Sequence, residues 1–204
     1  MRIFMVRASR RKSMTEHTLQ QKLIAEFIGT LFLTYTVCLT AVWGSSGDFH
    51  PGFAIAATLM AMIYSLGHIS GAHFNPAVTI GVWIRGSCEK DEVTPYIATQ
   101  SIAGVLGALL SGYTHTGEYS VDSLETASLL LNSEIHEVLM SEFLFTFALV
   151  YVILNVATSE ATSGNQYYGV AIASVVFAGA ISVGDVSMAS FNPAVTISLI
   201  TVGK

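Results

Sequence analysis

The seven residues Phe-Asn-Pro-Ala-Val-Thr-Ile occur twice in this chain, at 74–80 and again at 191–197. Asn is favourable immediately before a helix, because its side-chain oxygen accepts a backbone N–H that the first turn leaves unpaired. The Pro that follows suits the first helical position, where a missing N–H costs nothing. The repeat therefore predicts two helices that begin in the same way, at Asn75 and Asn192, 117 residues apart.

The composition indicates a membrane protein, and the fold class that we expect is all-α. Hydrophobic residues make up 52% of the chain and charged residues only 11%, whereas a soluble domain carries about 25% charged residues. The net charge of -5 argues against nucleic-acid binding. Two cysteines, Cys38 in an apolar run and Cys88 in a polar connection, indicate neither a disulfide framework nor a metal cluster. We identify no enzymatic constellation and no cofactor or metal site in the sequence.

Five apolar runs are long enough to cross a hydrocarbon core of about 30 Å. They are 23–43, 53–69, 93–110, 138–157 and 168–183. The apolar runs inside and after the repeated strings, 76–84 and 193–200, are shorter. The first of these, as a helix, rises only about 13 Å, which is under half of the bilayer. These two segments are therefore expected to enter the membrane without crossing it.

Basic residues favour the cytoplasmic side of a membrane protein. Residues 1–22 hold six Lys or Arg residues and a single acid, and we interpret them as a cytoplasmic tail. An Arg-rich organelle transit peptide is the alternative. With the N-terminus cytoplasmic, eight of the nine basic residues fall on that side, and the acidic connection 114–135 falls on the other.

The similarity between the two halves of the chain extends beyond the seven-residue string. Residues 52–57 match 169–174 at four of six positions, and 25–27 resemble 141–143. The segments 23–113 and 136–204 therefore share one plan: a Glu-bearing span, a Gly-led span and a short capped helix. Three spans separate the two short helices, so the halves are inverted relative to each other. Inverted repeats with broken helices are a known way to build a transport site near the bilayer midplane.

The two short helices are expected to meet with their N-termini facing each other. Each N-terminus carries unpaired N–H groups and about half a positive charge, which makes a cation costly between them. The side-chain amides of the two Asn residues can donate to a passing neutral solute. The predicted pore centre consists of Asn75, Pro76, Ala77, Asn192, Pro193 and Ala194.

Each half also carries one carboxylate within its first span, Glu26 or Glu142. A bare carboxylate is costly in a bilayer. Each is therefore expected to accept N–H groups of the non-helical segment that precedes the short helix, at 70–74 or 184–191. A proton-relay role in a coupled transporter is the alternative.

Three further polar residues lie near these segments. His68 is expected to be a packed, hydrogen-bonded residue beside the first segment, and His73 is expected to face the pore. Metal ligation by the two histidines is the alternative. Asp185 is expected to be a hydrogen-bond partner within the second segment.

The segment 68–79, HISGAHFNPAVT, resembles the first signature of the aquaporin, or major intrinsic protein, family. Ala25-Glu26-Phe27 and the Ser-Phe-Asn-Pro-Ala at 190–194 resemble other landmarks of that family, so that the resemblance covers about residues 22–201. It implies six spans and two half-helices in each subunit, one pore per subunit, and a homotetramer in the lipid bilayer. It also implies passive passage of water or small uncharged solutes.

The first departure from the family pattern concerns the outer constriction. The family usually places Arg directly after the second Asn-Pro-Ala, where this chain has Val195. Counted from the two Asn residues, the other positions of that constriction are Ile55, Ala180 and Ala189. This ring contains no aromatic, His or Arg, so we expect it to be wider and more apolar than in strict water channels. The Asp typical of glycerol facilitators is replaced by Thr196, so that neither usual solute class is indicated.

The second departure is a sixth span that the sequence does not contain. The repeat predicts a counterpart of 93–110 at about 210–230, beyond Lys204. We therefore expect five full spans and two re-entrant half-helices. The chain is then either a fragment or the product of a premature stop, or a shortened member whose missing pore wall is supplied from elsewhere. Besides a channel, two other functions remain open: a shortened, non-conducting membrane protein and a coupled secondary transporter.

Overall fold

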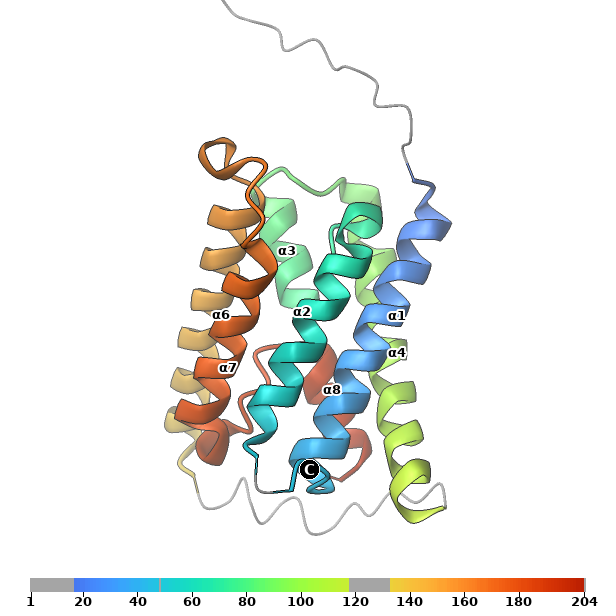
Figure 1. Ribbon diagram of the computed structural model, residues 1–204, viewed down its shortest axis with the longest axis vertical. Helices are drawn as coiled ribbons and strands as arrows, with labels where there is room; N and C mark the ends of the chain where they lie inside the picture. The colour runs from blue at the N-terminus through green and yellow to red at the C-terminus, as the bar shows by residue number, and fades with distance from the viewer. Residues whose placement is uncertain (1–16, 48, 118–132, 204) are drawn as a thin grey trace, which may run out of the picture.

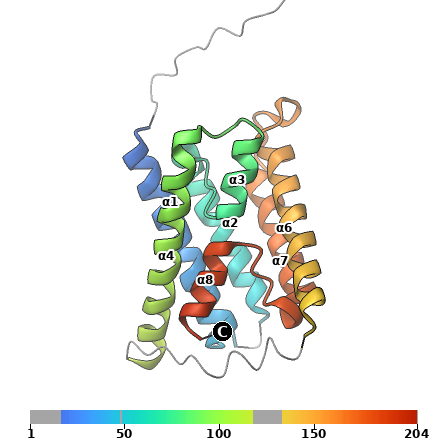
Figure 2. The ribbon, with the colours of Figure 1, turned by 180° about the vertical axis from the view of Figure 1, so that it is seen from behind.

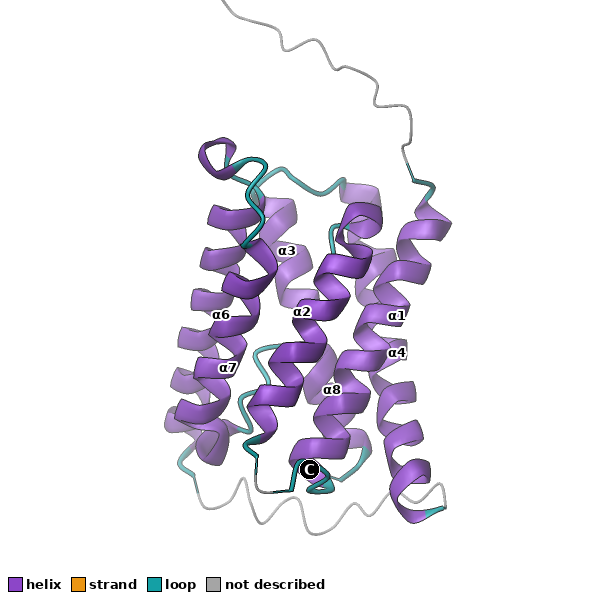
Figure 3. Cartoon of the chain, viewed as in Figure 1, coloured by secondary structure: helices purple, strands orange, loops and turns teal. Residues whose placement is uncertain are grey.

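The computed structural model describes residues 17–47, 49–117 and 133–203, and their regular structure is entirely helical (Figures 1 and 3). Five helices are long and apolar enough to cross a membrane. They are α1 (Leu19–Val37, continued by the π-helical η1, Cys38–Val42), α2 (Pro51–Ser70), α4 (Lys90–Thr116), α6 (Ile135–Ala157) and α7 (Tyr168–Ser187). Two short helices, α3 (Pro76–Ile84) and α8 (Pro193–Thr201), and a 3-10 turn, η2 (Glu160–Thr162), complete the fold. The expected set of five spans and two short helices is confirmed.

Both short helices begin at the Asn-Pro pair of their repeated string. The backbone of Asn75 is extended, and its Oδ1 accepts the backbone N–H of Ala77 at 2.8 Å and of Val78 at 3.4 Å. Asn192 is also extended, and its Oδ1 accepts the N–H of Ala194 at 2.9 Å. The side chain of each Asn thus satisfies donors of the first turn that the helix itself cannot pair.

The helices extend beyond the apolar runs that predict them. α1 begins four residues before its run, because the Thr18 side chain accepts the N–H of Gln21 while the Gln21 side chain accepts the N–H of Thr18. α7 continues to Ser187, so the second non-helical segment is 188–191 and not 184–191, and the first is 71–74. Hydrophobicity marks the part of a helix that lies in lipid, whereas hydrogen bonding continues past it. The basic segment 1–16 and residues 118–132 of the acidic connection lie outside the described residues.

The spanning helices surround the two short ones. α1 packs against α2 and α4, α6 packs against α7, and α2 packs against α7 across the two halves. In Figure 2, α3 lies above α8 in the middle of the bundle, with α4 on one side and α6 on the other. α3 packs against both α4 and α6, and α8 packs against α4 and α1.

The phenylalanine before each Asn packs closely against a glycine of a spanning helix. Phe74 and Phe191 are 0% and 2% exposed. A Cβ on Gly29 of α1 would lie 2.1 Å from the ring of Phe74, and a Cβ on Gly179 of α7 would lie 2.3 Å from the ring of Phe191. Both glycines therefore permit a ring to approach the helix backbone, and this fixes the chain directly before each short helix.

Candidate functional site

The N-termini of the two short helices meet through a reciprocal pair of hydrogen bonds. Asn75 Nδ2 donates to the carbonyl oxygen of Phe191 at 2.9 Å, and Asn192 Nδ2 donates to the carbonyl oxygen of Phe74 at 2.9 Å. Both Asn side chains are buried, at 4% and 6% exposure. Each half of the chain therefore positions the Asn of the other half.

A fully buried carboxylate holds the segment before α3. Glu26 Oε1 accepts the Ser70 hydroxyl at 2.7 Å and the His73 N–H at 2.9 Å, while Oε2 accepts the Phe74 N–H at 2.7 Å. Ala72 and Phe74 have φ of 52° and 50°, an uncommon conformation for residues with a Cβ. The carboxylate binds the N–H groups of this strained segment, and so compensates for its backbone cost.

The second half repeats this arrangement with Glu142. Its Oε1 accepts the Ser187 hydroxyl at 2.7 Å and the Ser190 N–H at 3.0 Å, and its Oε2 accepts the Phe191 N–H at 2.7 Å and the Ser190 hydroxyl at 2.9 Å. Here Ala189 and Phe191 have φ of 48° and 46°. Unlike Glu26, Glu142 is only partly buried.

A cavity of about 1000 Å³ extends along the bundle past both asparagines. Its lining includes His50 at the start of α2 and residues from Thr158 to Asn165 in the connection after α6, which lie at opposite ends of the bundle (Figure 1). Asn75 and Asn192 line it between those ends. The space therefore passes the N-termini of both short helices.

The four residues expected at the outer constriction all line this cavity. Ile55 projects from α2, Ala180 from α7, Ala189 from the segment before α8, and Val195 from α8. All four side chains are apolar. Pro76, Ala77, Pro193 and Ala194 are not among the residues that line the cavity. In both strings the Asn lines the cavity, and the Pro and Ala that follow it do not.

The charged residues of the lining are acids. Asp185 lines one end of the cavity and Glu160 the other, and no Lys or Arg of the described residues contributes to it. The expectation for Asp185 was wrong in one respect: it lies inside α7 and not in the loop, because the helix runs on to Ser187. Its exposed side chain faces the cavity end near His50.

His73 faces the cavity as expected, whereas His68 differs from the expectation of a packed, hydrogen-bonded residue. His73 is buried, lines the cavity and pairs with the Thr79 hydroxyl at 3.2 Å. His68 also lines the cavity, but it is exposed and its ring meets that of His17 edge-on at 6.2 Å. The hydrogen-bonded histidine is therefore His73, because the turn after Gly71 brings it over the first turn of α3. Among the described residues no group of His, Cys, Asp or Glu side chains is placed to hold a metal ion.

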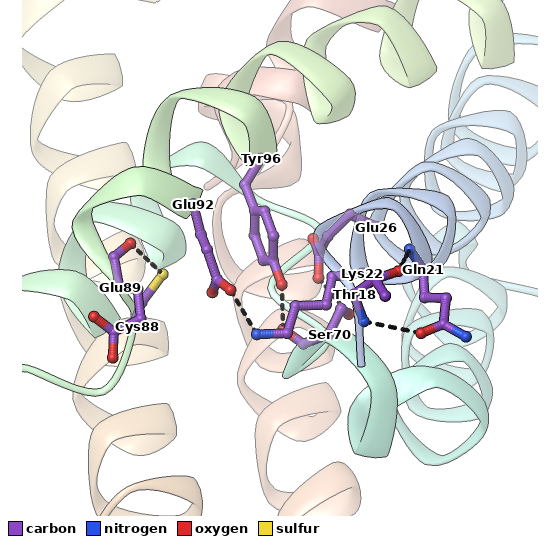
Figure 4. Close-up of polar contacts among 9 residues, drawn as sticks. All are labelled: Thr18, Gln21, Lys22, Glu26, Ser70, Cys88, Glu89, Glu92 and Tyr96. Atoms are coloured by element: carbon purple, nitrogen blue, oxygen red, sulfur yellow. Dashed lines mark hydrogen bonds and ion pairs between the residues drawn. The ribbon is translucent and has the colours of Figure 1, made fainter. Parts of the chain in front are cut away.

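Two residues of α4 belong to the site although their sequence context gives no sign of it. Gln100 Nε2 donates to Glu26 Oε2 at 2.8 Å and to the Thr79 hydroxyl at 3.0 Å. The Tyr96 hydroxyl donates to the carbonyl oxygen of Ser70 at 2.8 Å (Figure 4). Both side chains are almost fully buried. The spacing of four residues between Tyr96 and Gln100 suggests that the two side chains share one face of α4. It does not indicate which loop that face contacts.

An ion pair joins α1 and α4 at the same end of the bundle. Lys22 Nζ of α1 lies 2.5 Å from Glu92 Oε1 of α4, next to the Tyr96–Ser70 contact (Figure 4). Both side chains are only partly buried, at 26% and 18% exposure. The pair therefore adds little stability by itself, although it joins α1 to α4 one helical turn before Glu26.

Comparison with known proteins agrees with this geometry. The model of the major intrinsic protein family matches residues 13–204. Aquaporin NIP1-1 of Arabidopsis thaliana is 40% identical over 182 residues, which cover 85% of this chain and 61% of that protein. Aquaporin Z of Photorhabdus laumondii is 31% identical over 189 residues, which cover 85% of this chain and 80% of that protein.

A solved structure shares the fold. The aquaglyceroporin from Plasmodium falciparum superposes with a TM-score of 0.72 at 20% identity, over 92% of this chain and 84% of that one. The chain spans about three fifths of the length of the Arabidopsis relative. With the five apolar helices, the family match shows an integral membrane protein that crosses the bilayer several times. The chain belongs to the major intrinsic protein, or aquaporin, family.

Proposed function

We propose that this chain forms a passive transmembrane channel for water or small uncharged solutes. The main support for this proposal is the cavity, which extends between the two ends of the bundle and passes Asn75 and Asn192. Family membership supports it, because the relatives that match are themselves aquaporins.

The electrostatics of the pore centre favour neutral solutes. The N-termini of α3 and α8 face each other there, each with about half a positive charge. A cation that left water for this point loses hydration and meets positive ends on both sides. A neutral solute with an oxygen acceptor meets polar groups without this penalty. The pore centre in this proposal is the pair of strings, with Asn75 and Asn192 as the residues that contact the solute.

The outer constriction sets the size and polarity of the solute. Ile55, Ala180, Ala189 and Val195 line the cavity with apolar groups and supply no fixed donor or charge. A solute there keeps its hydrogen bonds only to water or to backbone carbonyls. The ring therefore favours solutes larger and less polar than water, such as small polyols and amides, over strict water selectivity.

Orientation and assembly follow from the sequence and the family. Lys22, Arg85 and Lys90 lie at one end of the bundle, where α1 and α4 begin, and the positive-inside rule makes that end cytoplasmic. The N-terminus is then cytoplasmic. A homotetramer with one pore in each subunit is the assembly that the family resemblance implies.

Stopped-flow light scattering on proteoliposomes tests this function. Water permeability is measured with an impermeant osmolyte, and solute permeability with gradients of glycerol and urea. The channel predicts at least one permeability above that of protein-free vesicles, with no dependence on an ion gradient. Permeabilities equal to those of empty vesicles for all three would overturn the proposal, and ion-coupled uptake would replace it with a coupled transporter.

A further inference from the structure

Two polar side chains line the end of the cavity beyond the apolar constriction. They are His50, directly before α2, and Asp185, in the last turn of α7. The start of α2 and the end of α7 lie at the same end of the bundle (Figure 1). The constriction, to which Val195 belongs, offers a solute no side-chain hydrogen bond, whereas these two residues carry a donor and an acceptor. We call this end of the cavity the outer mouth.

The backbone next to His50 is packed against α7. A Cβ on Gly52 would lie 2.8 Å from the Cβ of Ala180, and the rings of Phe53 and Phe177 meet edge-on at 6.2 Å. The start of α2 therefore lies against α7 at the level of Ala180, one of the four constriction residues. This packing fixes His50 close to the constriction.

His50 caps α2 in a way that leaves one ring nitrogen available. Its Nδ1 accepts the backbone N–H of Gly52 at 3.1 Å. A ring nitrogen that accepts a hydrogen bond carries no hydrogen, so the ring hydrogen is on Nε2. Within the described residues, this Nε2 has no hydrogen-bond partner. The side chain thus offers an N–H donor at the cavity that it lines.

Asp185 offers the complementary acceptor. Its side chain is exposed, and it has no hydrogen bond or ion pair with any other part of the chain that the structure describes. A negative charge in the last turn of a helix is unfavourable, because the helix dipole is negative at that end. The local structure therefore gives no reason for an acid at this position, whereas the cavity does.

The cavity has room for a solute between the constriction and Asp185. Asp185 follows Ala180 by five residues, which corresponds to about 7.5 Å along the axis of α7. Gly184 also lines the cavity, and no atom lies within 4 Å of a Cβ placed on it. A solute of a few heavy atoms can therefore lie beside Gly184, within reach of the carboxylate.

The side chains of fixed charge near the outer mouth are negative. Glu134 and Glu137 lie at the start of α6, at the same end of the bundle as Asp185 (Figure 2). The Lys and Arg residues that the structure describes all lie at the opposite end, where α1 and α4 begin. An anionic solute therefore meets repulsion at the outer mouth that no basic residue of the described ranges offsets.

We propose that His50 and Asp185 form a solute-binding subsite at the outer mouth, which takes small neutral solutes with N–H or O–H donors in preference to carboxylate anions. The proposal rests on the proposed channel function and names its solute class as amides and polyols. Asp185 accepts a hydrogen bond from the solute, and His50 Nε2 donates one to the oxygen of the solute. A site that pairs such groups discriminates against an analogue that lacks them. The solute is thus selected before it enters the apolar constriction.

Saturation-transfer NMR on the full chain in detergent micelles tests the subsite without conduction. The probes are acetamide and acetate, which have the same shape and a methyl group but differ in charge and in N–H donors. Titrations give the two dissociation constants, and the unchanged chain should bind acetamide more tightly. Asp185→Asn removes the charge at nearly constant shape. A unit charge about 4 Å away in water changes binding on the order of fivefold, so the preference should fall by about this factor.

Two further variants separate the donor from the general charge of this end. His50→Asn keeps a side-chain oxygen that can cap α2 but lacks the ring with Nε2, so acetamide should bind on the order of threefold more weakly. Glu137→Gln is the matched control. It removes a charge from the same end, does not line the cavity and keeps an oxygen for the helix cap. It should leave the preference nearly unchanged at about 0.1 M salt, which screens distant charges.

Four outcomes overturn the proposal. They are equal affinity of the unchanged chain for acetamide and acetate, a preference that Asp185→Asn leaves unchanged, an equal fall in Glu137→Gln, and acetamide binding that His50→Asn does not weaken. Water permeability of the unchanged chain is measured separately in proteoliposomes. A chain that conducts water without the preference contradicts the subsite alone, and one that shows the preference without any conduction contradicts the channel alone.

Discussion

The side-chain amide of Asn75 lies 2.9 Å from the carbonyl oxygen of Phe191, the residue directly before Asn192. The reverse bond, from Asn192 to Phe74, has the same length. Each Asn thus has two tasks: its oxygen caps its own helix, and its nitrogen holds the other half of the chain. The pore centre is one hydrogen-bonded unit made from segments more than a hundred residues apart.

Replacement of either Asn should therefore affect both halves. Asn75→Ala and Asn192→Ala each remove a cap and a buried hydrogen bond, and each should lower the free energy of unfolding by about 1–3 kcal/mol. The double variant should deviate from additivity by about 0.5 kcal/mol or more, because the two residues contact one shared unit. Unfolding in mixed SDS micelles measures the free energy of unfolding of the two single variants and of the double variant.

Asn155→Ala is the control for this cycle. Its amide bonds only to Tyr151 within its own helix and it is exposed, so the change should stay within about 0.5 kcal/mol. Strict additivity of the two pore-centre variants would show that the halves are fixed independently.

The two carboxylates provide a matched comparison. Glu26→Gln and Glu142→Gln each replace an acceptor oxygen by an N–H₂ group that faces donors. An unpaired buried polar group costs about 1–3 kcal/mol. Because Glu26 is fully buried and Glu142 only partly, the loss in unfolding free energy should be larger for Glu26→Gln. The same unfolding assay checks this, and an equal or larger loss for Glu142→Gln would contradict the role given to the deeper burial of Glu26.

Two glycines of α7 should respond differently to replacement by alanine. A Cβ on Gly179 would lie 2.3 Å from the Phe191 ring, whereas nothing lies within 4 Å of a Cβ on Gly184. Gly179→Ala should cost about 1–3 kcal/mol through overpacking. Gly184→Ala should be neutral or stabilise the helix by up to about 1 kcal/mol. Thermal unfolding of the two variants measures the change in stability of each. Equal changes would contradict the close packing of the Phe191 ring against Gly179.

Cys88 reports on the orientation of the chain. It lies in the connection between α3 and α4 and is half-buried, and burial, with a smaller contribution from the charge of Glu92, raises the pKa of its thiol. The thiolate fraction at neutral pH is therefore lower than for a free cysteine, so alkylation should be slower and should increase further into the alkaline range. A membrane-impermeant maleimide should react only from the cytoplasmic side.

Cys88→Ser supplies the control for that experiment, since the remaining Cys38 is 0% exposed and should not react. Labelling of Cys88 from the opposite side would reverse the proposed orientation.

The repeated string carries most of what the sequence alone predicts. Asn-Pro fixes where α3 and α8 begin, because capping depends on a few adjacent residues. The Glu-bearing spans and the inverted order follow from the same repeat. Ile55, Ala180, Ala189 and Val195, which were counted from the two Asn residues, lie on one cavity, because the spacing along regular helices is fixed.

What the sequence does not predict depends on contacts between distant residues. Gln100 lies in a span of ordinary composition, and only the packing of α4 against α1 brings it to Glu26. The bond between Asn75 and Phe191 needs both halves in place. The apolar run 168–183 ends four residues before α7 does, because the helix continues through Gly184 and Asp185 to Ser187.

In the proposed channel, solutes pass through the cavity that Val195 lines. The most direct test is the ratio of glycerol to water permeability in proteoliposomes of the unchanged chain, Val195→Arg and the neutral control Val195→Met. Arg adds a fixed charge and donors to an apolar ring, so the ratio should fall several-fold in Val195→Arg and change much less in Val195→Met. The same ratio in all three proteins, each shown to be folded, would contradict it.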